Sequence, residues 1–218
     1  MSVCDELLHP LEVLLRTRFA YAYGHRVGVT GTFARGEGFT QSPHANAERV
    51  EEHALANLDR SKEAFVTHYR DEIKQGHTYK PEAYNRMPIW VAAEAFFFGT
   101  LSRLIEASST SGVLNDIADS MNTSRKLLPG QVKSFVYLRN RVSHCAQLWN
   151  HRVLDVPGLQ PKTTRNTKRH YRNVKPWVLW GVFHLVFTNL CWWLWLGRLC
   201  GGGGQTCSWA MWGAHARF

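Results

Sequence analysis

The sequence has no CxxC pair and no even set of cysteines. Its five cysteines are scattered along the chain: Cys4, Cys145, Cys191, Cys200 and Cys207. An odd, scattered set argues against a disulfide framework, and the missing CxxC spacing argues against a zinc site. We therefore expect reduced thiols, no bound metal and a cytoplasmic location.

The start of the chain lacks the pattern of a secretory signal. Asp5 and Glu6 stand where such a signal carries positive charge, and Pro10 and Glu12 interrupt any apolar stretch. This pattern predicts that the protein is not exported.

Acidic residues are in the minority. The chain has 26 Lys and Arg residues against 17 Asp and Glu, which gives a formal charge of +9 and a pI near 9.6. Such a protein attracts polyanions, and the charge alone does not choose between nucleic acid and an anionic membrane surface.

Helical spacing of apolar residues recurs through the first 150 residues and predicts an all-α fold. Residues 24–46 are rich in glycine and predict a loop. Within the apolar segment after Pro88, we expect the charge of Glu94 to be buried and paired with an arginine. The predicted helical segments are 6–23, 47–74 as two helices, 88–105, 113–121 and 131–152.

The last of these segments carries polar residues whose spacing matters. Asn140 and His144 are four residues apart and share a helix face, and Arg141 adjoins His144 from three residues before it. Arg139 lies off that face, although its long side chain can reach a phosphate bound between two subunits. The spacing alone leaves open which arginine would act.

A histidine near an arginine and an amide can cleave RNA without metal or other cofactor. The ribose 2′-hydroxyl is an internal nucleophile, histidine can move the protons, and arginine can hold the phosphate. In a chain with 11 histidines such a match also arises by chance, and composition by itself favours a structural motif.

Four blocks of sequence carry more information than the motif alone. They are LEVLLRTRFAYAYGH (11–25), SKEAFVTHY (61–69), PIWVAAEAFFFGTLSRL (88–104) and YLRNRVSHCAQLWNHR (137–152). In order and spacing they resemble the Abi-like (abortive infection bacteriophage resistance) family of the AbiD/AbiF type, within the HEPN superfamily. The resemblance covers about residues 5–155.

The resemblance implies a HEPN-type helical bundle that acts as a metal-independent endoribonuclease, with two RN-x-x-x-H helices paired across a homodimer. It implies that Arg139 binds phosphate, that His144 is the general acid and base, and that Asn140 is the neighbouring polar residue. Relative to the family the bundle is expected to be shortened at its N-terminus. The secondary candidates are Arg141 for RNA binding, Ser143 and Asn150; each is also explained by a solvated basic face or a hydrogen bond at a helix end.

The sequence predicts three parts: a helical domain over 1–157, a basic linker over 158–176, and an apolar, Trp-rich and Gly-rich tail over 177–218. Lys168, Arg169 and Arg172 in the linker are candidates for salt-sensitive RNA binding, or are ordinary solvated charges. Residues 177–197 contain no Lys, Arg, Asp or Glu. We interpret them, in order of preference, as a buried terminal helix, as an abnormal tail or as a membrane span.

Three functions follow from these patterns. The first is a phage-defence endoribonuclease, whose partners are RNA, a second copy of the chain and a regulatory RNA or antitoxin. The second is a noncatalytic RNA-binding or partner-binding HEPN module. The third is a membrane-associated effector that uses the Trp-rich segment.

Overall fold

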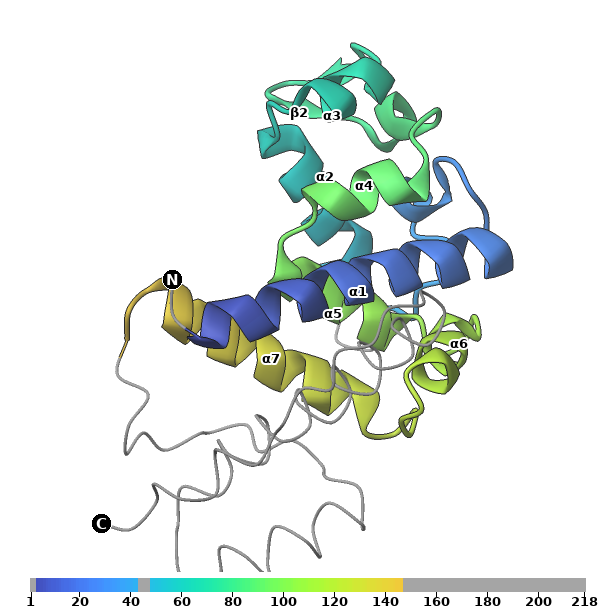
Figure 1. Ribbon diagram of the computed structural model, residues 1–218. Coiled ribbons are helices and arrows are strands. Elements are labelled where there is room, and N and C mark those ends of the chain that lie inside the picture. Colours follow the sequence, from blue (N-terminus) through green and yellow to red (C-terminus); the bar gives the residue numbers. More distant parts are fainter. Residues whose placement is uncertain (1–2, 43–47, 147–218) are drawn as a thin grey trace, which may run out of the picture.

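The computed structural model describes residues 3–42 and 48–146, which form a helical bundle around helix α1 (Val3–Arg26) (Figure 1). Helix α1 contacts α4 (Ile89–Ala95), α6 (Val113–Ser120) and α7 (Leu128–Ser143). Helix α5 (Phe98–Ala107) packs between α2 (Val50–Arg60) and α7. The predicted all-α class is confirmed, with one small hairpin added.

Helix α1 forms because its apolar residues repeat at helical spacing. Leu11, Leu15, Phe19 and Tyr23 follow one another at intervals of four residues, and none is more than 1% exposed. This spacing places all four on one stripe, which faces the other helices. The helix predicted over 6–23 is confirmed and extends three residues further at each end.

The glycine-rich segment after α1 is more ordered than predicted. It contains the 3₁₀ helix η1 (Thr32–Arg35), and both Phe33 and Phe39 are buried in the core. Gly31 precedes η1 with a φ of 66°, and a Cβ there would lie 2.7 Å from the Asn85 backbone. Only glycine fits this close approach without strain. Residues 43–47 lie outside the described part.

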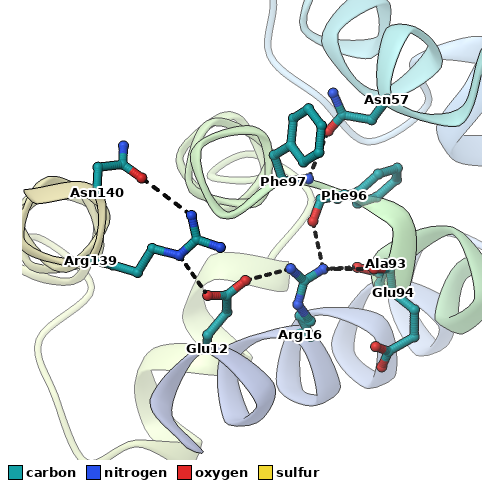
Figure 2. Close-up of polar contacts among 9 residues, drawn as sticks. All are labelled: Glu12, Arg16, Asn57, Ala93, Glu94, Phe96, Phe97, Arg139 and Asn140. Atoms are coloured by element: carbon teal, nitrogen blue, oxygen red, sulfur yellow. Dashed lines mark hydrogen bonds and ion pairs between the residues drawn. The ribbon is translucent and has the colours of Figure 1, made fainter. Parts of the chain in front are cut away.

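The single helix predicted over 88–105 is wrong, because the chain breaks between α4 and α5. Phe96 and Phe97 are both extended, with φ and ψ near −72° and 134° and near −64° and 149°. Arg16 donates to the carbonyl of Phe96 at 2.6 Å and to carbonyls in the last turn of α4, while Asn57 Oδ1 accepts the Phe97 N–H at 2.8 Å (Figure 2). Side chains from α1 and α2 thus satisfy the backbone groups that the break leaves unpaired.

The prediction for Glu94 is also wrong. Its side chain is exposed and points away from the bundle, and only its backbone carbonyl accepts from Arg16, at 3.2 Å (Figure 2). The carboxylate that pairs with an arginine inside the bundle is Glu12, whose side chain is 11% exposed.

The chain between α2 and α4 differs in part from the predicted pair of helices. Helix α3 (Ala64–Tyr69) follows α2, but an antiparallel hairpin of β1 (Lys74–Gln75) and β2 (Thr78–Tyr79) comes next, and the 3₁₀ helix η2 (Pro81–Tyr84) leads to α4. The guanidinium of Arg70 lies 4.1 Å from the centroid of the Tyr79 ring. The helix predicted through residue 74 ends instead at Tyr69, because Arg70 is extended, with a φ of −90° and a ψ of 121°.

One exposed ion pair joins the end of α1 to the start of α6. The Arg26 guanidinium donates to both carboxylate oxygens of Asp116 at 2.7 Å, and these hydrogen bonds lower the pKa of Asp116 below its ordinary value. A carboxyl whose pKa is lower in the folded state stabilises the fold above its unfolded pKa, about 3.9, and loses that contribution as pH falls through the folded pKa.

Asp116→Asn is therefore expected to lower the free energy of unfolding slightly at pH 7, by about 1 kcal/mol or less for an exposed pair. At a second, acidic pH its difference from the unaltered chain should be smaller, because the stabilisation is lost as pH falls through the lowered folded-state pKa of Asp116. Urea denaturation at both pH values checks this, with the exposed Asp119→Asn on the same helix as the control. A deficit that stays constant with pH would contradict the assignment.

Within residues 3–42 and 48–146, the structure contains no helix that combines the length and the apolar character needed to cross a membrane. The basic linker, the Trp-rich run and Asn150 all lie outside the described residues. The predictions made for them, including Lys168, Arg169 and Arg172, stay predictions.

Candidate functional site

The predicted motif lies at the C-terminal end of α7. Val132, Phe135, Leu138 and Val142 are buried and hold one face of the helix against the core. The opposite side carries the polar residues, and Asn140, Ser143 and His144 are exposed there. The burial pattern thus turns the motif toward the surface.

Helix α7 ends earlier than the predicted boundary at residue 152. The helix stops at Ser143, and His144 caps it with a φ of −91°. Cys145 then adopts the left-handed region, with a φ of 49°. Its N–H bonds to the Val142 carbonyl at 3.0 Å and the Ala146 N–H bonds to the Arg141 carbonyl at 2.8 Å, which is the hydrogen-bond pattern of a Schellman motif.

The predicted relation between Asn140 and His144 nevertheless holds. The His144 N–H donates to the Asn140 carbonyl at 3.0 Å, as in an unbroken helical turn. The early end of the helix leaves His144 at the tip, one turn beyond Asn140. Within the described part of the chain, the His144 imidazole has no hydrogen-bond partner.

Cys145→Gly is expected to stabilise the protein, because a left-handed residue with a Cβ costs roughly 1–2 kcal/mol. Glycine also raises the conformational entropy of the unfolded chain, which cancels about 0.5–1 kcal/mol of this stabilisation. The free energy of unfolding is therefore expected to rise by up to about 1 kcal/mol. Chemical denaturation measures it. Cys145→Ala removes the thiol and keeps the Cβ, and equal stability of the two variants would contradict the helix end described above.

The structure brings Arg139 and Asn140 together, and Arg139 also contacts α1. Arg139 Nη1 lies 3.5 Å from Asn140 Oδ1, and Arg139 Nε lies 3.5 Å from Glu12 Oε2 (Figure 2). The Arg139 side chain remains 42% exposed. Arg139, which ideal helix geometry placed off the motif face, is therefore oriented by a neighbouring helix and still open to a ligand.

The secondary candidates are placed differently. The Arg141 guanidinium lies 5.9 Å from the centroid of the Tyr137 ring, one turn earlier on the same helix. Ser143 is exposed in the last turn of α7. The contact of Arg141 with an aromatic face accounts for that side chain without a ligand.

Sequence reasoning missed Glu12 and Arg16 as residues of this site. Arg16 Nη2 lies 2.5 Å from Glu12 Oε1, and both side chains are almost buried. The signal was present as a Glu and an Arg four residues apart inside the apolar repeat of LEVLLRTR. A pair with this spacing ordinarily lies on a solvated helix face. That Glu12 also contacts a second arginine, Arg139, is apparent only once α7 packs against α1.

The side chains of the described residues limit the chemistry that this site can perform. Among them, no group of three or more His, Cys, Asp or Glu side chains is placed to hold a metal ion. What the end of α7 presents is an imidazole, a guanidinium and an amide. Together these groups can bind a phosphate and transfer a proton.

A family model described as Abi-like protein matches residues 2–150. The match spans every described helix and the whole RN-x-x-x-H motif. No curated protein and no solved structure gives a significant match. The resemblance read from the four sequence blocks is confirmed, whereas the AbiD/AbiF type and the HEPN superfamily stay predictions.

Proposed function

Because the chain belongs to the Abi-like protein family, which supports a role in abortive infection of phage-infected cells, we propose that it acts there as a metal-independent HEPN endoribonuclease. One observation carries this proposal. His144 and Asn140 are exposed one turn apart at the tip of α7, and Arg139, next to Asn140 in the chain, has its guanidinium partly open to solvent.

Each motif residue has a step in the proposed reaction. Arg139 binds the scissile phosphate and offsets the negative charge that develops on its oxygens. A histidine removes the proton of the ribose 2′-hydroxyl, whose oxygen attacks the phosphorus. The bond to the 5′-oxygen breaks, that oxygen takes a proton from a second histidine, and the products end in a 2′,3′-cyclic phosphate and a 5′-hydroxyl.

The need for two histidines motivates the homodimer. One must start without its proton and the other with it, and each chain supplies His144 at the tip of one helix. In the proposed dimer, the end of α7 faces the same end of a second copy. Each subunit would then contribute Arg139 and His144 to a shared site.

The second candidate is a noncatalytic RNA-binding module. It is favoured by the formal charge of +9, because a basic chain attracts a polyanion whether or not it cleaves it. Such a module binds RNA through salt-sensitive contacts and leaves it intact.

The test is cleavage of total cellular RNA by the purified full chain in EDTA, followed by analysis of the product ends. EDTA inactivates contaminating nucleases that need a metal ion. The ribonuclease predicts fragments with 2′,3′-cyclic phosphate ends that disappear in Arg139→Ala. Intact RNA that is nevertheless bound would overturn the ribonuclease and support the binding module. Arg125→Ala, an exposed arginine just before α7, is the matched control and should cut normally.

A further inference from the structure

We infer that Glu12 is a positioning residue that sets the orientation of Arg139 for phosphate binding, and that Arg16 holds Glu12 in place. The inference deepens the proposed ribonuclease and rests on it for its catalytic meaning. It stands on the contacts that join α1, α7 and the break between α4 and α5 (Figure 2).

The two oxygens of one carboxylate hold two arginines. Glu12 Oε1 lies 2.5 Å from Arg16 Nη2, and Glu12 Oε2 lies 3.5 Å from Arg139 Nε. The Glu12 side chain is 11% exposed, so water screens these interactions less than at an open surface. Two guanidiniums and one carboxylate leave one net positive charge, and the cluster still attracts a phosphate.

Glu12 contacts Nε of Arg139, and this choice of atom determines which edge of the guanidinium can face a bound phosphate. A guanidinium has five N–H donors in a fixed plane, and an ion pair at Nε fixes the direction of the others. With Nε turned to Glu12 and Nη1 near Asn140, Nη2 is the Arg139 nitrogen for which the described residues provide no polar partner, and it is left for a phosphate. An arginine held this way loses less conformational entropy when it binds.

Arg16 makes this arrangement rigid. Its Nη1 donates to the carbonyls of Ala93, Glu94 and Phe96, where α4 ends, while its Nη2 holds Glu12. Arg16 is itself only 12% exposed and spans from α1 to the break. Arg16 therefore holds the Glu12 carboxylate in one orientation, in which its other oxygen contacts Arg139.

The variant Glu12→Gln distinguishes a role of Glu12 in orienting Arg139 from an effect of its negative charge alone. Removing a negative charge should leave the KM for RNA unchanged or lower it, whereas a misdirected guanidinium should lower kcat by about 10- to 100-fold. The control Glu94→Gln makes the same charge change on an exposed side chain nearby and should alter neither parameter. If Glu12→Gln left kcat/KM at the value of the unaltered chain, the inference would be overturned.

A double-mutant cycle tests whether Glu12 acts through Arg139. If it does, Glu12→Gln should reduce cleavage in the unaltered chain but have less than about a twofold effect in the Arg139→Ala background. Equal effects in both backgrounds would show a purely structural role and overturn the inference.

A measurement on the unaltered full chain needs neither activity nor a folded Glu12 variant. The ¹⁵N relaxation of the Arg139 Nε–H, assigned with Arg139→Lys, should show a rigid group, in contrast to the exposed Arg125. Equal mobility of the two would overturn the positioning inference. Uncut RNA together with a rigid Arg139 would instead overturn the proposed ribonuclease, so the two failures are distinguishable.

Discussion

His144→Ala is expected to lower the rate of RNA cleavage by about 10³-fold, because general acid and base catalysis by one side chain contributes about 10²- to 10⁴-fold. The imidazole lies at the exposed tip of α7 and supports no core contact, so the variant should fold normally. RNA affinity should change little, since Arg139 and the net positive charge of the chain remain. Single-turnover cleavage of a defined RNA in EDTA, with binding measured separately, gives both quantities.

The control for this variant is His77→Ala, which removes an exposed histidine from the turn between β1 and β2. It should cleave at the unaltered rate. If His144→Ala also cleaved at that rate, the histidine at the tip of α7 would have no catalytic role. A parallel loss in both variants would point to a general effect of removing histidines.

Phe19→Ala is expected to lower the free energy of unfolding by about 3–5 kcal/mol, the range for deleting a buried aromatic ring. Phe19 is fully buried in the middle of α1, and its ring centroid lies 5.6 Å from that of Tyr23. Because α1 contacts α4, α6 and α7, a cavity there weakens the packing of several helices at once. Urea denaturation followed by circular dichroism measures the loss.

Tyr21→Ala is the matched control for the core variant. Tyr21 is an aromatic residue on the same helix but is 75% exposed, so its removal should change stability by about 0.5 kcal/mol or less. Similar losses for Phe19→Ala and Tyr21→Ala would contradict the burial pattern of α1.

The helices that the sequence predicted well are those whose apolar repeat is local. The α1 stripe of Leu11, Leu15 and Phe19 and the helix α6 follow from spacing alone, and both are confirmed. The break at Phe96 and Phe97 could not be predicted, since neither proline nor glycine marks it. It depends on Arg16 and Asn57, which are far away in the sequence and meet the break only after folding.

The candidate site shows the same contrast between local sequence signals, which can be predicted, and contacts between distant residues, which cannot. The RN-x-x-x-H residues were found because the motif lies in one short stretch and the four family blocks keep their order along the chain. The end of α7 was misplaced because Cys145 occupies the left-handed position where glycine is the usual signal. Glu12 was missed because its contact with Arg139 joins the first and last described helices.

That last contact also has a consequence for the order in which the protein becomes able to act during translation. Glu12 leaves the ribosome early and Arg139 late, with every other described helix between them. A nascent chain that still holds α7 in the ribosomal tunnel has α1 and the α4–α5 break but no Arg139 or His144 to complete the site. For the ribonuclease proposed above, the growing polypeptide would not yet cut the messenger and ribosomal RNA around it, because its site assembles only when synthesis has passed α7.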